Sequence, residues 1–466
     1  MTPTTGDDRL ADLLREHLGH QRWFAGKGRD WRVITTRTVG VLQDSEPTVR
    51  VELVWVGFPG DEVETYQVPL VEYDHEVEHL AHALVGPLEG EGPTRWVYDA
   101  LADRDVTGLW LAGVSDERVA GALRFRRDAT AEKVPEGLAS IVVGAEQSNT
   151  SLVFGDQAIL KVFRKVAPGI NPDIEIHSAL AGAGSIHIAE PFGWLEGTWS
   201  DPVLDTEVTG SLAILQAFLP SATEGWDMAQ TSVRDLFAEG DLRADEVGGD
   251  FAAEAYRLGA ATAEVHADLA RTLPHGVFDP AALAVLAGAM RGRLDRAADE
   301  VEALRPYADA LGDAYEDLAR LRRPVPVQRI HGDFHLGQVM RTLDGWRLLD
   351  FEGEPAKSLA ERRALDSPVR DVAGMLRSFD YAARHRLVEH GPDPQLEYRA
   401  AEWAERNRSA FCDGYAETVN SDPRDEPVLL RAYETDKAVY ELVYESRNRP
   451  SWIPIPLAAV ARLANG

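Results

Sequence analysis

The period of the hydrophobic pattern changes near residue 220, and this change limits the fold more than any other feature of the 466-residue chain. Before it, apolar and polar residues alternate in short runs, which predicts strands at 33–42, 48–58 and 63–71. After it, apolar residues recur every three or four positions, which predicts helices at 250–272, 280–303, 307–321, 369–385, 396–419 and 426–447. Strands followed by helices predict an α+β protein with two lobes.

The first half contains a second group of predicted elements. Residues 139–166 read as three short strands, and 210–222 as another. Between them, 171–184 begins with Asn-Pro, carries acidic residues in its first turn and ends in Gly, which predicts a short capped helix. The Gly- and Pro-rich stretch 85–93 is predicted to be a linker.

Charge and cysteine content exclude several classes of protein. The formal net charge of −29 argues against binding to nucleic acid or to anionic membranes, because their phosphates would be repelled. The single cysteine, Cys412, cannot form an internal disulfide, which fits a reducing compartment. No export signal is visible at the N-terminus, and the most apolar run, 280–290, is too short to span a bilayer. We therefore expect a cytoplasmic protein.

Two acidic residues interrupt a mostly apolar segment in the helical half. In "RIHGDFHLGQVMRTLDGWRLLDFEGE" (329–354), Asp333 and Asp350 lie seventeen positions apart, and Gln338 follows the first by five. A buried carboxylate is costly unless hydrogen bonds, a cation or a metal compensates it. As single residues, these would be loop residues that cap backbone amides; as an ordered set, they indicate a site.

The ordered set resembles the catalytic core of the protein-kinase-like, aminoglycoside-phosphotransferase-like superfamily. The resemblance implies a bilobal fold in which Asp333 is the base that faces the acceptor hydroxyl, with His335 beside it, while Gln338 and Asp350 hold Mg²⁺. Two departures stand out. Gln338 occupies a position that is usually Asn, and Asp350 begins Asp-Phe-Glu instead of Asp-Phe-Gly, so that Glu352 adds a carboxylate.

The same resemblance implies a nucleotide site upstream. Lys161, in an alternating strand, matches the lysine that contacts the α- and β-phosphates of ATP. Its ion-pair partner is expected to be Glu175, with Asp173 as the alternative. The segment 144–154 occupies the position of the phosphate loop but is not Gly-rich. The remaining candidates are Ser148, Asn149 and Thr150 for the phosphates, and the backbone from Gln216 to Phe218 for adenine.

A narrower resemblance covers the chain from its first helix to its last. "QRWFAGKGR", "EQSNTSLVF", "LKVFRKVAPGINPDIE", "HGDFHLGQV" and "DKAVYELVYESRNRPSWIPIP" are similar to segments of bacterial maltokinases. That family phosphorylates maltose at its anomeric hydroxyl with ATP, for α-glucan (glycogen) synthesis from trehalose. The resemblance implies an N-terminal β-rich cap (1–90), an intermediate nucleotide-binding part (91–219) and a mostly helical lobe with the sugar site (220–466). Many relatives are fused to or associate with trehalose synthase; no such domain is present here, so we expect a standalone form with that enzyme as a partner.

The segment 433–452 is the candidate sugar site. Its spacing places one set of residues on a single helical face, namely Lys437, Tyr440, Glu441, Tyr444 and Glu445. Sugar rings stack on aromatic planes and sugar hydroxyls bind charged groups, so such a face suits a sugar. A solvated face with ion pairs between successive turns explains the pattern equally well, and the family resemblance favours the sugar site.

Three functions follow in order of preference. The first is a maltokinase that uses ATP and Mg²⁺. The second is a kinase of the same fold that acts on glucosamine or another sugar, because the catalytic core would be shared. The third is a non-catalytic scaffold that recruits trehalose synthase, against which the complete set Asp333, Gln338, Asp350 and Lys161 argues.

Overall fold

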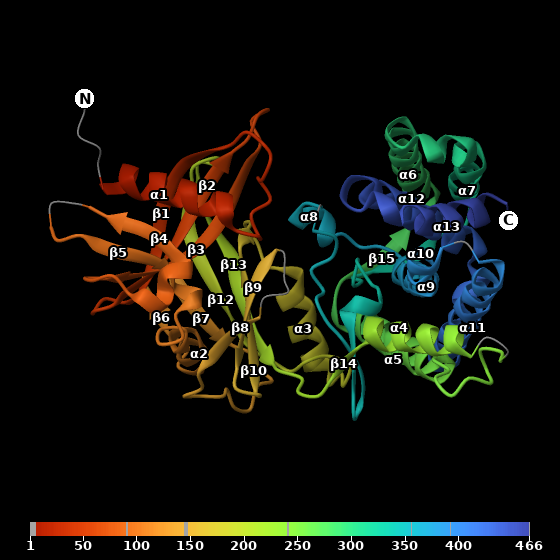
Figure 1. Ribbon diagram of the computed structural model, residues 1–466, viewed down its shortest axis with the longest axis horizontal. Coiled ribbons are helices and arrows are strands. Elements are labelled where there is room, and N and C mark those ends of the chain that lie inside the picture. The colour runs from red at the N-terminus through yellow and green to blue at the C-terminus, as the bar shows by residue number, and fades with distance from the viewer. Residues whose placement is uncertain are drawn as a thin grey trace. The chain divides into compact units, whose positions relative to one another are not determined.

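The computed structural model describes residues 6–89, 92–143, 148–239, 242–355, 357–391 and 393–465. The chain forms two compact units, the first comprising Met1–Gly182 with Ala189–Pro220 and the second Ala183–Ile188 with Ser221–Gly466. Strands dominate the first unit and helices the second (Figure 1), which confirms the predicted α+β class. No helix of the described residues combines the length and apolar character needed to cross a membrane.

The first unit begins with an antiparallel sheet, here called the cap sheet. Its strand order is β1-β2-β3-β5-β4, and β11 pairs with β3. The three strands predicted between 33 and 71 are present nearly as expected. The bounds are β1 (Arg32–Gln43), β2 (Thr48–Gly57), β3 (Val63–Tyr73), β4 (Leu84–Leu88), β5 (Arg95–Asp99) and β11 (Lys165–Val166).

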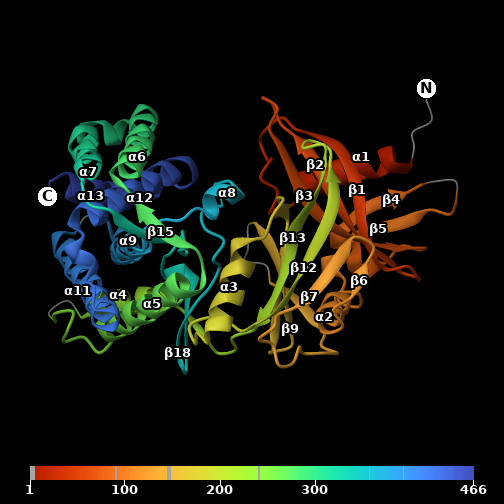
Figure 2. The same ribbon diagram turned by 180° about the vertical axis from the view of Figure 1, so that it is seen from behind.

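A second antiparallel sheet follows, with the order β6-β7-β12-β13-β10-β9-β8. Its longest strands, β12 and β13, pair along their lengths and are seen in yellow-green in Figure 2. The bounds are β6 (Val119–Ala120), β7 (Leu123–Arg127), β8 (Ser140–Val143), β9 (Asn149–Phe154), β10 (Ala158–Phe163), β12 (Pro191–Asp201) and β13 (Thr206–Ala217).

The predicted linker at 85–93 contains a strand, which corrects that expectation. Strand β4 pairs with β5 at the edge of the cap sheet. Its Val85 is buried in a core cluster with Leu14 of α1, and this burial outweighs the local Gly-Pro signal. Pro87 is tolerated because an edge strand need not donate every hydrogen bond to a neighbour.

Helices and a shared core hold the first unit together. The helices are α1 (Gly6–His20), η1 (Glu78–Ala83), η2 (Ala100–Ala102), α2 (Gly108–Ser115) and α3 (Pro172–Ala183). One core cluster joins Trp55 of the cap sheet, Trp110 of α2 and Leu215 of the second sheet. The segment after α1 also contributes, because Trp23 is buried and the Arg164 guanidinium lies 4.6 Å from its ring. The aromatic segment thus packs in the core of the cap and contacts the residue that connects β10 to β11.

The second unit is mostly helical. Its helices are α4 (Gly225–Ala238), α5 (Ala252–Thr272), α6 (Pro280–Glu300), η3 (Glu302–Tyr307), α7 (Ala308–Arg320), η4 (Leu336–Gln338), α8 (Leu359–Arg362), α9 (Val369–His385), α10 (Leu387–His390), α11 (Pro394–Val419), η5 (Pro423–Asp425), α12 (Pro427–Asn448), η6 (Pro450–Trp452) and α13 (Pro454–Ala464). Short strands complete it: β14 (Thr223–Glu224), β15 (His275–Phe278), β16 (Val325–Gln328), β17 (Val339–Thr342) and β18 (Gly345–Leu348). The six helices predicted from the period are all present.

Close packing of α5 against α11 sets the frame for the site. A Cβ atom on Gly259 would lie 2.0 Å from the carbonyl oxygen of Phe411, and one on Gly414 would lie 2.0 Å from that of Tyr256. The two backbones therefore approach so closely that only glycine fits at these positions. This contact brings His266 of α5 and Tyr415 of α11 together behind the loop that carries Asp333.

Candidate active site

The loop from β16 to η4 carries Asp333, and Asp371 of α9 holds it in place. The Asp371 carboxylate accepts hydrogen bonds from the backbone N–H groups of His331 (2.7 Å) and Gly332 (2.8 Å). Although Asp371 lies in the first turn of its helix, its side chain bonds to the loop and caps no helix. Gly332 has φ +86°, and the loop turns there.

Two further residues support Asp371 from behind. His266 Nε2 lies 3.1 Å from Asp371 Oδ2, and His266 Nδ1 lies 3.0 Å from the Tyr415 hydroxyl. The His266 side chain is buried, and it orients Asp371 by a hydrogen bond. Sequence reasoning did not identify His266, because a single histidine on an apolar helix face is most often a core residue.

The strand pair β17–β18 returns the chain so that Gln338 and Asp350 meet. Gln338 Nε2 donates to Asp350 Oδ2 at 2.9 Å. Asp350 has φ +62°, a left-handed conformation that Asp tolerates better than most residues. The bond leaves the amide oxygen of Gln338 and the carboxylate of Asp350 as hard oxygen donors of the type that Mg²⁺ prefers. The longer Gln side chain therefore reaches Asp350, and the metal-binding role of the pair stays a prediction.

Asp333 forms an ion pair with Lys437 of α12. Lys437 Nζ donates to Asp333 Oδ1 at 2.8 Å. Burial favours a raised pKa for the Asp333 carboxyl, but the Lys437 ammonium outweighs burial and holds that pKa well below its usual range. Asp333 is therefore ionised throughout the physiological pH range.

His335 is neutral at physiological pH. Burial lowers the pKa of its imidazole to about 4, although the Asp333 carboxylate opposes this shift. Its Nδ1 accepts a hydrogen bond from the backbone N–H of Gly337 at 3.0 Å, which fixes the ring at the start of η4. The imidazole thus lies next to Asp333 without adding a positive charge.

Asp333 and Lys437 line a cavity of about 270 Å³ that is formed entirely by the second unit. Aromatic and charged side chains surround it. Its aromatic residues are Phe334, Tyr433 and Tyr440; its cations are Arg293, Arg296, Lys357, Arg370, Lys437 and Arg447; its carboxylates are Glu300, Asp333, Glu354, Asp371 and Asp436.

Each lining carboxylate has a partner. Arg293 binds Asp436 through both carboxylate oxygens, and a nitrogen of Arg370 lies 2.8 Å from Glu354. The pairs Arg447–Glu300 and Lys437–Asp333 complete the set, since Asp371 is held by His266 and the loop. Sequence reasoning did not select the cations Arg293, Arg296 and Arg370, because α6 and α9 come to the cavity only through tertiary packing.

The predicted sugar-facing surface of α12 is divided. Lys437 and Tyr440 line the cavity, but Glu441 accepts from the buried Arg377 at 2.6 Å. Glu445 is also buried and accepts from Tyr381 at 2.5 Å. Both carboxylates are thus bound by other protein side chains and lie outside the lining of the cavity, and their predicted contact with the sugar stays a prediction.

Tyr444 continues the aromatic surface beyond the cavity. Its ring stacks with that of Tyr440, with centroids 6.4 Å apart and planes 26° from parallel. Tyr440 is 41% and Tyr444 40% exposed, and a cation lies over each ring, Lys437 over Tyr440 and Arg449 over Tyr444. The arrangement is compatible with the predicted stacking role for both residues.

In the first unit, Lys161 of β10 forms an ion pair with α3. Its Nζ lies 3.4 Å from Asp173 Oδ2, and Asp173 also pairs with His177 at 3.0 Å. Asp173, the alternative partner in the sequence, therefore contacts Lys161 directly. The role of Glu175 stays a prediction.

The other predicted nucleotide contacts lie in the same sheet. The hydroxyl of Thr150 accepts from Arg164 at 2.8 Å, and Asn149 is buried, whereas Ser148 is exposed. The Phe218 backbone N–H donates to the Gln157 carbonyl at 3.0 Å, and the Gln216 side chain is buried. The first part of the predicted phosphate loop, 144–147, lies outside the described residues. These nucleotide-binding roles remain predictions.

Two protein-family models match the chain. The model of the maltokinase N-terminal cap domain matches residues 17–103. The model of the phosphotransferase enzyme family matches residues 141–415, more than half of the chain.

Relatives and solved structures agree with these matches. A glucosamine kinase from Streptacidiphilus jiangxiensis is 33% identical over 67% of this chain and 70% of its own length. A glucosamine kinase from Mycolicibacterium smegmatis is 28% identical over 69% of this chain and 78% of its own.

Among solved structures, a glucosamine kinase in complex with glucosamine, ADP and inorganic phosphate has a TM-score of 0.67 at 24% identity, covering 96% of this chain and 98% of its own. A second glucosamine kinase structure (crystal form B) has a TM-score of 0.68 at 24% identity, covering 94% of each chain. These likenesses confirm the predicted kinase-like fold with a β-rich cap. The chain belongs to the phosphotransferase enzyme family and carries a maltokinase N-terminal cap domain.

Proposed function

We propose that the protein is a sugar kinase that transfers the γ-phosphoryl group of ATP to the anomeric hydroxyl of maltose. One observation carries this proposal: the ionised Asp333 carboxylate lines a cavity of about 270 Å³ whose other walls carry cations, aromatic rings and carboxylates that already have partners in the protein. The cavity size suits a small ligand, and its residue types suit a sugar with a hydroxyl directed at Asp333.

The transfer requires no covalent intermediate with the protein, which acts by positioning the substrates and stabilising charge. The acceptor oxygen forms a bond to the γ-phosphorus, the bond from that phosphorus to the β–γ bridging oxygen breaks, ADP leaves, and the hydroxyl proton passes to Asp333. Because Lys437 lowers the pKa of Asp333, the carboxylate is a weak base and contributes mainly by orienting the hydroxyl. Proton transfer then comes late, as charge develops on the acceptor.

Two further groups act on the nucleotide. Gln338 and Asp350 would hold Mg²⁺ through their oxygen atoms, and the ion would neutralise charge on the phosphates. Lys161 would contact the phosphates, in a position that its ion pair with Asp173 maintains. The matched family supports this assignment of roles.

The charge pattern of the cavity favours a neutral acceptor. An ammonium group, as on an amino sugar, binds best to a carboxylate that no other cation occupies. Glu300, Glu354 and Asp436 are each bound by arginine, and Asp333 by Lys437. Maltose places only hydroxyls and ring faces in the cavity, and the maltokinase cap domain supports the same choice.

Glucosamine is the second candidate acceptor, because the two relatives described above are named glucosamine kinases. The same loop would phosphorylate either sugar, and only the contacts that the cavity makes with the sugar would differ. Association with trehalose synthase, a place in α-glucan synthesis and a cytoplasmic location stay predictions of the sequence.

A panel of acceptors separates the candidates. The full chain with ATP and Mg²⁺ is offered maltose, glucose, glucosamine and maltotriose, and ADP release is measured with the Asp333→Asn variant as the blank. We expect the highest kcat/KM with maltose, with phosphate located at C1 by NMR of the product. A higher value with glucosamine would establish the second candidate, and no ADP release above the blank with any sugar would refute the kinase assignment.

A further inference from the structure

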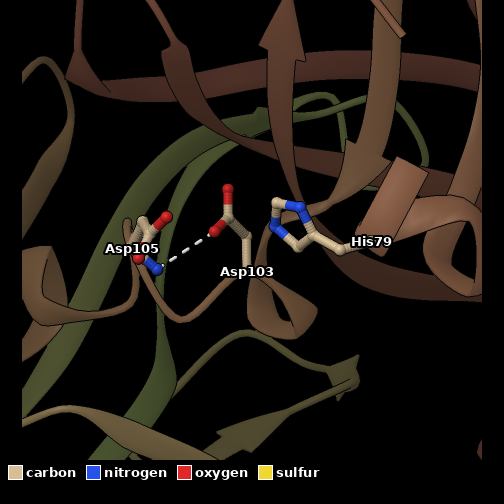
Figure 3. A group of neighbouring side chains, drawn as sticks. All are labelled: His79, Asp103 and Asp105. Atoms are coloured by element: carbon tan, nitrogen blue, oxygen red, sulfur yellow. Dashed lines mark hydrogen bonds between the residues drawn. The ribbon is translucent and has the colours of Figure 1, made fainter. Parts of the chain in front are cut away.

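A group formed by one imidazole and two carboxylates lies in the cap, far in sequence from every residue of the candidate active site. His79 belongs to η1, Asp103 follows η2 directly, and Asp105 lies two residues further on. Ligand atoms of the three side chains all lie within 4.8 Å of one another. Figure 3 shows the Asp103 carboxylate between Asp105 on one side and the His79 ring on the other.

The central carboxylate is held rigidly. Asp103 is fully buried, and its Oδ2 accepts a hydrogen bond from the Tyr73 hydroxyl at 2.7 Å. Its Oδ1 accepts from the backbone N–H of Asp105 at 3.0 Å, and its carbonyl accepts from the N–H groups of Val106 and Thr107. Asp103 is therefore oriented before any ligand arrives.

The charges of the group are not balanced by the protein. Both donors to the Asp103 carboxylate, a hydroxyl and an amide, are neutral. Within the described part of the chain, neither Asp103 nor Asp105 forms an ion pair. A fully buried carboxylate next to a second one is unfavourable, and a bound cation offsets both the burial and the repulsion.

We propose that His79, Asp103 and Asp105 bind one Zn²⁺ ion in the cap. Histidine nitrogen and carboxylate oxygen are both ligands of Zn²⁺ in proteins, whereas Mg²⁺ prefers oxygen donors alone. Bonds of about 2.1 Å hold ligand atoms roughly 3 to 4 Å apart. Because His79 and Asp105 are exposed, small rotations of their side chains close the remaining gap and leave a coordination position for water.

The ion would have a structural role. It ties η1 to the loop before α2, two segments that are 24 positions apart in the chain, and it does so through a residue already bound to β3 by Tyr73. A ligand that binds only the folded state raises the stability of that state. The cap is therefore expected to unfold at a higher temperature when Zn²⁺ is bound.

Titration calorimetry on the full chain tests the site. The protein is stripped with a chelator, supplied with millimolar Mg²⁺ to occupy the kinase metal site, and titrated with Zn²⁺. We expect one tight site per chain, lost or weakened by at least about tenfold in His79→Ala and Asp105→Asn. His82→Ala is the matched control, because His82 is an exposed histidine of the same helix outside the group.

Co²⁺ gives an independent readout, because its visible absorption reports nitrogen and oxygen ligation, and we expect the signal to disappear in His79→Ala. Kinase turnover with Mg²⁺ should equal wild type in both variants, which shows that they are folded. The proposal is overturned if the wild type binds no Zn²⁺, if both variants bind as the wild type does, or if His82→Ala loses as much affinity as His79→Ala.

Discussion

Each unit of the molecule contains a lysine–aspartate ion pair, and the two pairs differ in what surrounds the carboxylate. In the first unit, Asp173 is buried and shared between Lys161 and His177. In the second, Asp333 lines a cavity, and within the described residues its side chain is bonded through Oδ1 alone, to Lys437. The enclosed pair keeps a lysine in position, whereas the open pair keeps a carboxylate ionised with its second oxygen available to a ligand.

The largest expected effect comes from removing the charge of the open carboxylate. Asp333→Asn should lower kcat at least about 100-fold, because both the orientation of the acceptor and proton transfer are lost. ADP release measures kcat, and circular dichroism verifies folding. Asp436→Asn is the control in the same cavity: its carboxylate is bound by Arg293, so kcat should change far less. Equal losses in both variants would refute the special role of Asp333.

Replacing each lysine tests the comparison directly. Lys437→Met removes the cation that lowers the pKa of Asp333, so this pKa rises and the acidic limb of the kcat/KM profile moves to higher pH. We expect the acceptor KM to rise about tenfold, equivalent to about 1.4 kcal/mol. Lys161→Met should instead raise the ATP KM by a similar factor and leave the acidic limb in place. If both variants changed the same KM, the two pairs would not have separate roles.

His335 makes the stability of the second unit depend on pH. Its pKa is about 4 in the folded protein and near 6.5 when unfolded, so the unfolded state binds its proton at the higher pH. The contribution of His335 to the free energy of unfolding is fully present above pH 6.5. It falls by about 2 kcal/mol as the pH drops toward 4. Asp333 does not interfere, because its lowered pKa keeps it charged throughout this window.

Urea denaturation at pH 7 and at pH 4.5 measures this dependence. Between pH 7 and pH 4.5, the free energy of unfolding of His335→Asn should fall by about 2 kcal/mol less than that of the wild type, because the amide does not titrate. An equal decrease in the free energy of unfolding of both proteins would show that protonation of His335 does not destabilise the folded state.

The smallest effect concerns the support behind the catalytic loop. Tyr415→Phe removes the hydroxyl that bonds His266, so stability should fall by about 1 kcal/mol while kcat falls only slightly. Tyr256→Phe is the control, because its hydroxyl bonds an exposed Glu417, and its stability should stay within about 0.5 kcal/mol of wild type. If kcat of Tyr415→Phe instead fell by more than about tenfold, the hydroxyl would be needed to position Asp333 and not only to stabilise the fold.

Local patterns in the chain were enough to predict many of the strands and helices and to single out the loop that carries Asp333. Alternation and three-to-four spacing depend only on near neighbours, so the strands β1 to β3 and the helices α5, α6, α7, α9, α11 and α12 were predicted near their observed bounds. The motif residues Asp333, Gln338 and Asp350 are close in sequence, and a loop with a strand return brings them together.

Contacts between distant segments could not be read in this way. The cations from α6 and α9 around the cavity, the support of Asp371 by His266 and Tyr415, and the binding of Glu441 and Glu445 by other side chains all depend on how helices pack. A helical period places a residue on a face but does not say which neighbour that face will meet. Residue types and spacing therefore specified the elements and the chemistry, whereas packing in three dimensions selected the partner, the burial and hence the charge state of each functional group.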